Sequence, residues 1–170
     1  MAGLFQNDLK IVDLVGREGT KPVPVAGRHH NAFTGRSAIL IDSESASASA
    51  VLARVVQLEN RGFIVGDRSS GTVMEARLYP HEIALDSEVS YAISVTDADL
   101  VMTDGKSLEH VGVEPDIVVL PTSQDLANKR DPALAKAAGL VGAKLSPEEA
   151  GTILPYVECS QFQATLSLND

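Results

Sequence analysis

The chain has 170 residues, which is enough for one domain with a buried core and too few for two of ordinary size. Its formal net charge is -9 and it contains no cluster of Lys and Arg, so we expect no nucleic-acid surface. No apolar stretch reaches membrane-spanning length, and the N-terminal residues lack the basic start and long apolar core of a signal peptide. The single cysteine, Cys159, excludes an internal disulfide and is interpreted as a partly buried tail residue rather than a catalytic thiol.

The N-terminal segment predicts little regular structure. Residues 9–14 are typical of a short strand, and residues 16–28, rich in Gly, Pro and Lys, predict a loop with one extended piece at 23–26. His29 and His30 follow in a polar stretch. Because no carboxylate or cysteine lies near them at ligand spacing, a solvated loop is favoured over a metal site.

The stretch from Ser37 to Asp67 predicts one β-α-β unit. Residues 37–41 are rich in Ile and Leu and indicate a buried strand, and a tight polar connection leads to a helix over residues 47–60. Gly62 is well placed to end that helix, and residues 63–65 indicate the next strand.

Three serines, Ser45, Ser47 and Ser49, lie where this helix begins. The first turn of a helix has unpaired N–H groups and the positive end of the helix dipole. A serine there either caps the helix or attacks a carbonyl whose developing negative charge the N–H groups stabilise. Capping needs only one of the three, and the alanines between them leave room for a substrate backbone.

The second half of the chain predicts further strands. Residues 73–78 and the alternating stretch 82–101 indicate sheet strands, and residues 117–120 indicate another. Asp104-Gly105 is a hairpin signal, because a type I′ turn needs positive φ at both central residues.

Three motifs in order then carry a family resemblance. They are SASASA at residues 45–50, VGD at 65–67 and GVEPD at 112–116. With these motifs the chain resembles the C-terminal processing, or tail-specific, proteases, a family of serine peptidases. The likeness extends from about Phe33 to about Leu120.

The resemblance implies an α/β fold, the core of β-α-β units shared with Clp protease and crotonase-like proteins. In that family an N-terminal segment with a glycine turn precedes the stretch seen here, so we expect residues 1–122 to form an N-terminally incomplete catalytic domain. Residues 123–170 are expected to form a helical extension of the same domain. Asp131-Pro132 and Ser146-Pro147 each give a cap followed by proline, which starts a helix.

By the resemblance, Ser47 is the nucleophile, since the middle serine matches the family's, and the Ala48 backbone N–H contributes to the oxyanion hole. Thr72 occupies the position of the family's dyad lysine, and a threonine hydroxyl is no base at neutral pH. Ala50 stands where the family has a glutamate. The chain is therefore closer to members that lack the Ser-Lys dyad.

Tricorn-like members of the superfamily work without that lysine, using a histidine from far upstream and a glutamate before the GVEPD-type motif. Glu109 falls at the place of that glutamate and would be a supporting acid. His110 is the nearest local base, but a histidine beside a turn is more often a surface residue.

Two functional classes remain open. One is a serine-type peptidase that takes an extended peptide or protein substrate along a sheet edge, with the base in this chain or supplied from upstream. The other is a catalytically inactive domain of the same fold that binds peptides or assembles with itself. The resemblance implies no cofactor and no metal, and bare apolar surface on an incomplete core favours a homo-oligomer. The family is usually exported, which conflicts with the missing signal peptide and leaves the compartment open.

Overall fold

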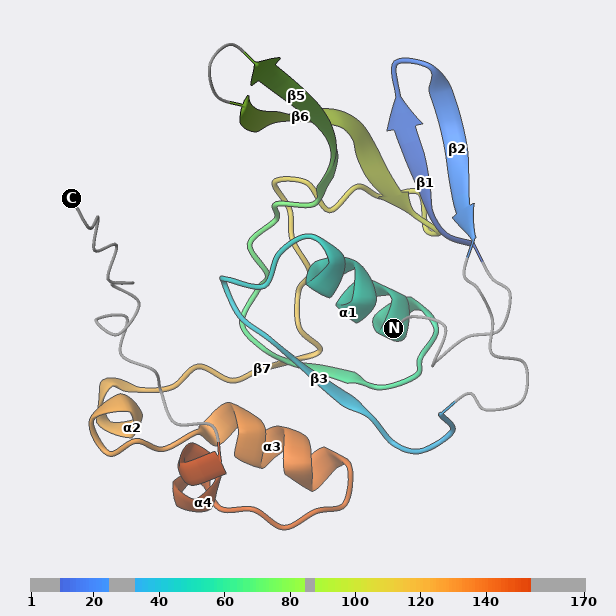
Figure 1. The fold of residues 1–170 in the computed structure, drawn as a ribbon. Helices are drawn as coiled ribbons and strands as arrows, with labels where there is room; N and C mark the ends of the chain where they lie inside the picture. Colours follow the sequence, from blue (N-terminus) through green and yellow to red (C-terminus); the bar gives the residue numbers. More distant parts are fainter. Residues whose placement is uncertain (1–9, 25–32, 85–87, 154–170) are drawn as a thin grey trace, which may run out of the picture.

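The computed structural model describes residues 10–24, 33–84 and 88–153, and these residues form two sheets with helix α1 between them (Figure 1). One is a three-stranded sheet of order β3-β4-β7, and the other is a four-stranded sheet of order β2-β1-β6-β5. His29, His30 and Cys159 lie outside the described residues.

The predicted β-α-β unit is present close to its expected bounds. Strand β3 (Ala38–Ile41), helix α1 (Ala48–Leu58) and strand β4 (Phe63–Gly66) follow one another, and β3 and β4 pair in parallel. Strand β7 (Ile117–Val118) pairs in parallel with the other edge of β4. Two parallel strands joined through a helix form a crossover unit, in which the helix covers one face of the sheet.

The core lies around α1. Four residues of the helix are buried, and two of them are alanines, which allow the backbone to approach its neighbours closely. The helix packs between side chains of both sheets, and the buried cluster includes Ile41 and Ile64 on one side and Val12 and Met102 on the other. Each such aliphatic side chain stabilises the fold by about 1.5–3 kcal/mol when fully buried.

Helix α1 ends earlier than the sequence suggests. Asn60, not Gly62, adopts the left-handed conformation, with φ of 52°. Asn tolerates positive φ better than most residues, so the helix can stop there. Gly62 has a different role, because a Cβ atom at this position would collide with the side chain and backbone of Ser37.

The expected loop at residues 16–28 is wrong in its first half. Strand β1 (Lys10–Gly16) turns through Gly19, with φ of 104°, into strand β2 (Gly19–Pro24), which pairs antiparallel with β1. The prolines of β2 concealed the strand in the sequence. They are tolerated because β2 is at the edge of its sheet, where proline costs no hydrogen bond on the open side.

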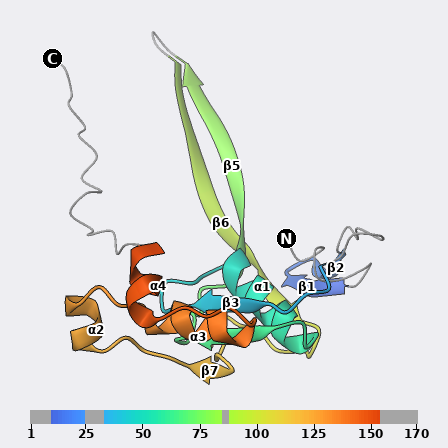
Figure 2. The ribbon, with the colours of Figure 1, turned by 90° about the horizontal axis from the view of Figure 1, so that it is seen from below.

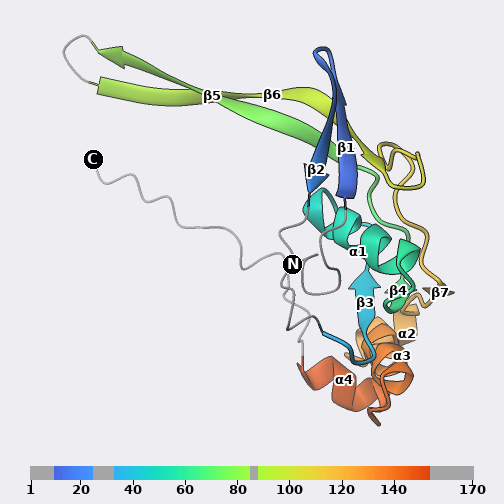
Figure 3. The same cartoon turned by 90° about the vertical axis from the view of Figure 1, so that its right-hand side faces the viewer.

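Strands β5 (Met74–Ala84) and β6 (Glu88–Met102) form a long antiparallel ribbon. The base of β6 pairs with β1, and the far end of the ribbon projects from the body of the protein (Figures 2 and 3). The strand expected at residues 73–78 is therefore the start of a longer element. We use the name ribbon below for the β5–β6 pair.

The turn after β6 is not of type I′. The N–H of Gly105 donates to the carbonyl of Met102, and only Gly105 within this turn has positive φ, at 78°. Asp104 pairs instead with Arg54 of α1, with 2.5 Å between Oδ2 and Nη2. After this turn, Ser107 makes an isolated antiparallel bridge to Val101.

Between β7 and residue 153, where the described part of the tail ends, the chain forms the helices α2 (Ser123–Ala127), α3 (Pro132–Leu140) and α4 (Pro147–Ile153). Asp131 caps α3, accepting from the Leu134 N–H at 2.8 Å, and Pro132 takes the first helical position. Helix α3 packs on β3 and β4, on the side of the sheet away from α1 (Figures 1 and 3). Helix α3 therefore covers the second face of the parallel sheet. The proposed division of the chain after residue 122 stays a prediction.

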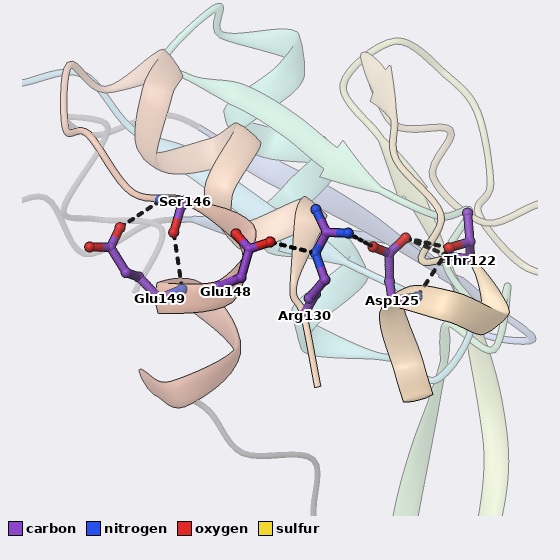
Figure 4. A network of polar contacts seen from close by, with 6 residues as sticks. All are labelled: Thr122, Asp125, Arg130, Ser146, Glu148 and Glu149. Carbon is purple, nitrogen blue, oxygen red and sulfur yellow. Dashed lines mark hydrogen bonds and ion pairs between the residues drawn. The ribbon is translucent and has the colours of Figure 1, made fainter. Parts of the chain in front are cut away.

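Polar contacts join these helices (Figure 4). Arg130 lies between Asp125 and Glu148, with nitrogen–oxygen distances of 3.5 and 3.0 Å. Asp125 exchanges hydrogen bonds with Thr122, and these lower the pKa of its carboxyl. The hydrogen bonds of Glu149 with the backbone and side chain of Ser146 lower the pKa of Glu149 in the same way.

Within the described residues, no helix is both long and apolar enough to cross a membrane.

Candidate active site

Ser47 occupies the N-cap position of α1 in an unusual backbone conformation, with φ of 50° and ψ of −125°. A serine rarely adopts these angles, and such a conformation costs on the order of 1–3 kcal/mol. A hydrogen bond from its N–H to the Thr72 carbonyl, at 2.8 Å, helps to hold it in place. The Ser47 side chain makes no capping hydrogen bond, so capping does not explain this residue.

The three serines differ in what their hydroxyl groups do. The Ser45 Oγ donates to Asp42 Oδ1 at 2.9 Å and accepts from the Asp42 N–H at 3.1 Å. The Ser49 Oγ donates to the Ala46 carbonyl at 2.6 Å. Within the described part of the chain, the Ser47 hydroxyl has no hydrogen-bond partner, and the residue is exposed. Ser47 is thus the serine of the three whose hydroxyl is available to a ligand.

The backbone N–H groups at the start of α1 also differ in whether they have a hydrogen-bond acceptor. The N–H of Ser47 is bonded to Thr72, and that of Ser49 donates to the Ala46 carbonyl at 3.1 Å. For the Ala48 N–H, the described residues provide no acceptor. It lies in the first turn of α1, where the helix dipole favours negative charge, so it is free to donate to an oxygen near Ser47.

The loop after β4 places Thr72 beside Ser47. In this loop, the N–H of Ser70 donates to the carbonyl of Ser45 at 2.9 Å. The buried Ser69 hydroxyl accepts from the Val113 N–H at 2.8 Å, which ties the loop to the third motif. The Thr72 backbone therefore contacts Ser47, whereas the match of Thr72 to the family's lysine stays a prediction.

Glu109 contacts the same loop but not Ser47. Its Oε2 accepts from the Val73 N–H at 2.6 Å, one residue after Thr72, and its side chain is 22% exposed. Among the described residues no hydrogen bond joins Glu109 to Ser47. The geometry assigns Glu109 a position that holds the loop, and its expected role as a supporting acid stays a prediction.

His110 has the geometry of a surface residue. Its side chain is 90% exposed, and its Nε2 lies 3.8 Å from Glu109 Oε1. Its backbone has φ of 59°, and its N–H donates to the Gly71 carbonyl at 2.7 Å. The backbone of His110 therefore supports the Thr72 loop, whereas no described contact joins its ring to Ser47.

Glycines of the second and third motifs allow close approaches around the site. Gly66 has φ of 129°, and a Cβ atom there would collide with the Ile41 carbonyl. Gly112 has φ of 73°, and a Cβ atom there would collide with the Ser69 carbonyl. Residues of the second motif and the start of the third thus lie against the segments that flank the first motif.

The sequence reasoning missed the contacts of Asp116, the last residue of the third motif. Its Oδ2 accepts from the Ile64 N–H at 2.8 Å, and its Oδ1 accepts from Gln57 Nε2 at 2.7 Å. Asp116 therefore ties the start of β4 to the last turns of α1. No local pattern in the sequence indicated these contacts, because Asp116 is separated from Gln57 and Ile64 by more than fifty residues.

A cavity beside Ser47 was also not predicted. It has a volume of about 690 Å³, and Ser47, Ala48 and Ser49 form one part of its wall. Most of the remaining wall is aliphatic, from β1, β2, α1 and β6, and includes Ile11, Leu14, Val23, Leu52 and Leu100. It is large enough for several apolar side chains of a ligand. In the described residues, no group of His, Cys, Asp and Glu side chains is arranged to hold a metal ion.

The β-α-β unit, the two sheets and the helices on both faces of the parallel sheet define an α/β fold of the Clp protease and crotonase-like class. Within this class the chain belongs to peptidase family S41, whose family model matches residues 1–119. Among curated proteins, none matches the chain.

Several solved structures share the fold. A Parabacteroides merdae protein, named as a candidate peptidase, is 19% identical with a TM-score of 0.64, and the match covers 84% of this chain and 46% of that protein. The photosystem II D1 C-terminal processing protease is 22% identical with a TM-score of 0.55, covering 87% of this chain and 35% of that one. The tricorn protease is 18% identical with a TM-score of 0.51, covering 80% and 12%. The chain thus spans less than half the length of each of these three.

Proposed function

We propose that this chain carries the nucleophile part of a serine peptidase active site. One observation carries the proposal: Ser47 combines a strained backbone, a hydroxyl without a described partner and a neighbouring free N–H at Ala48. Strained residues of this kind concentrate at functional sites, where the surrounding structure holds them in place. Membership of peptidase family S41 supports the same reaction class.

In this proposal the Ser47 Oγ forms a bond to the carbonyl carbon of the scissile peptide, and the carbonyl oxygen becomes an oxyanion. The Ala48 N–H donates to that oxyanion, and the positive end of α1 stabilises it further. When the intermediate collapses, the carbon–nitrogen bond breaks, the amine leaves with a proton and an acyl-enzyme ester remains. Water then hydrolyses the ester.

The hydroxyl proton needs a base, and we propose that a residue outside the described part of the chain supplies it. Thr72 has no basic group, and the His110 ring points to solvent beside Glu109. The chain spans less than half of the related structures, which leaves room for such a residue in a longer protein. Glu109 would act as a positioning residue, because it holds the Val73 N–H of the loop that contacts Ser47.

A second candidate is a domain that binds a polypeptide without cleaving it. Ala50, at the position of the family glutamate, is fully buried with 0% exposure, so an acidic group is not needed for this fold to form there. Ala50 and Thr72 thus replace two side chains, a glutamate and a lysine, that the resemblance implies to be charged. Under this alternative the tail-specific cleavage typical of the family would be lost, and the substrate site would remain as a binding site.

Labelling with a fluorophosphonate probe distinguishes the candidates. The probe would be applied to the 170-residue chain and to a form extended upstream, each with Ser47→Ala, Ser45→Ala and Ser49→Ala variants. We expect the extended form to be labelled, and labelling to be lost only in Ser47→Ala. Labelling that survives in Ser47→Ala would refute the assignment of the nucleophile, and an unlabelled extended form would favour the binding domain.

A further inference from the structure

We propose that one face of the ribbon is a docking track, which binds an extended apolar segment of the substrate polypeptide and leads it to Ser47. The inference rests on the proposed function, since it names a part of the substrate and where it binds. Three observations support it: apolar side chains lie on one face of the ribbon, a β-bulge places that face on the same side as the core, and two cavities share wall residues.

Apolar side chains gather on one face of the ribbon. Tyr79 lies opposite Ile93 in the antiparallel register, and Tyr91 and Val95 are at the same alternation as Ile93. These four side chains remain 41–50% exposed, and Ile83 on the same face is 53% exposed. Since residues at spacing two share a face of a strand, the docking track is defined by Tyr79, Ile83, Tyr91, Ile93 and Val95.

The reverse face of the ribbon is different. Leu78 lies opposite Ser94, and the other positions of β6 on this face hold Ser90, Ala92 and Thr96. Leu78 is thus a single apolar residue among small and polar ones, although it is 63% exposed. Scattered apolar residues are normal on protein surfaces, whereas a continuous apolar row indicates a binding surface.

A β-bulge joins the track to the interior of the protein. Glu75 pairs with Ala98, but Ala76 pairs with Thr96, so Asp97 is an extra residue of β6. An extra residue reverses the alternation of the strand beyond it. Val95 and Ile93 therefore lie on the same face as Leu100 and Met102, which pack against α1. Without the bulge, the apolar row would face the other way.

Two cavities connect this face with Ser47. The first has a volume of about 400 Å³ at the base of the ribbon, and Tyr79, Val95 and Arg77 are part of its wall. The second is the cavity of about 690 Å³ beside Ser47. Leu14 and Glu75 line both, so the cavities adjoin one another. The residues that line the two cavities therefore link the base of the ribbon with the proposed nucleophile.

The charges along this path favour an uncharged occupant. Arg77 pairs with Asp97 at 3.1 Å, and Lys21 pairs with Glu18 at 3.2 Å. Arg17 and Glu75 also line the first cavity, so its wall holds three cations and three carboxylates and has no excess charge to attract an acidic or a basic segment. An extended polypeptide with apolar residues at alternate positions matches both the neutral walls and the period of the track.

The occupant is expected on the face rather than on the edge of the ribbon. Strand β5 is an edge strand of its sheet, but Pro80 in its middle has no N–H to donate. The ring of His81 stacks on that of Tyr91, with 5.4 Å between their centroids, and stiffens the face. From the level of Val95, which lies opposite Arg77, to Ile83 the track is roughly 20 Å long at the rise of a strand, which accommodates about six extended residues.

The test measures binding without turnover, in the 170-residue chain carrying Ser47→Ala. The probe is a fluorescein-labelled sixteen-residue peptide in which Leu, Val and Phe alternate with Ser and Thr, and its affinity is read by fluorescence anisotropy. Tyr79→Ser with Ile93→Ser should raise the Kd by about tenfold or more, because two apolar contacts are lost. Leu78→Ser, on the reverse face of the same ribbon, should leave the Kd unchanged.

Three results would overturn the inference. They are no binding by the parent chain, an equal effect of Leu78→Ser, and no effect of the double substitution. Sedimentation of the same proteins adds a fourth: a dimer that the double substitution dissociates, with peptide binding unchanged, would assign the face to a second copy. Failure of the proposed function is distinguishable, because it would appear as absent labelling of Ser47 while the peptide still binds the track.

Discussion

The backbone strain at Ser47 leads to an unusual prediction, that Ser47→Gly stabilises the protein. Ser47 has φ of 50° and ψ of −125°, and its hydroxyl makes no described hydrogen bond, so the substitution removes strain and no contact. Relief of a strained residue is worth about 1–3 kcal/mol, and the extra freedom of glycine in the unfolded chain costs about 0.4–1 kcal/mol. The free energy of unfolding should therefore rise by roughly 1–2 kcal/mol.

The assay is urea unfolding followed by far-UV circular dichroism, with Ser47→Ala as the matched control. Alanine also lacks the hydroxyl but keeps the strain, so we expect the free energy of unfolding to change by less than about 0.5 kcal/mol. Replacing an ordinary N-cap serine by alanine lowers it by about 1 kcal/mol. A Ser47→Gly protein no more stable than Ser47→Ala would refute the strain. A large loss in Ser47→Ala would show that the serine caps α1 after all.

Three further predictions concern the surrounding structure. Gly112→Ala should lower the free energy of unfolding by roughly 2 kcal/mol or more in urea and Gly105→Ala by only about 1 kcal/mol, because both have positive φ but only Gly112 has a backbone neighbour in the way. Asp116→Ala should cost about 1–3 kcal/mol in the same assay, since a strand N–H loses its acceptor, and a cost below about 0.5 kcal/mol would contradict this. The pKa values of Asp125 and Glu149 are lowered from their usual values of 3.8 and 4.5, so their ionised carboxylates stabilise the helices at any pH above those usual values. This stabilisation is lost as the pH falls through the lowered pKa values. Thermal unfolding between pH 7 and 2 should show a weaker acid dependence in the Asp125→Asn, Glu149→Gln protein, and an unchanged dependence would contradict the assignment.

The sequence predicted the local elements where one signal dominated. The apolar runs at β3 and β4 and the amphipathic pattern of α1 fixed the β-α-β unit, and Asp131-Pro132 marked the start of α3. It failed where tertiary context overrides local preference. The prolines of β2 are harmless only because that strand is at an edge, which the sequence does not reveal.

For the candidate site, the motifs predicted which segments matter but not how they meet. The choice of Ser47 rested on the resemblance, and its free hydroxyl depends on hydrogen bonds that occupy Ser45 and Ser49. The place of Glu109 at the Val73 N–H depends on the loop after β4. Cavities and the bulge in β6 arise from pairing between distant strands, so neither could be predicted from local sequence patterns.

The most direct test of the central claim is to locate the fluorophosphonate adduct in the upstream-extended protein by tandem mass spectrometry. The peptide from residue 37 to residue 54, between two arginines, carries the three serines of the SASASA motif together with Ser37 and Ser43, and fragmentation separates all five. We predict an adduct on Ser47 alone, with Ser45 and Ser49 unmodified. An adduct on either of the other two serines, or on a residue outside this motif, would contradict the account.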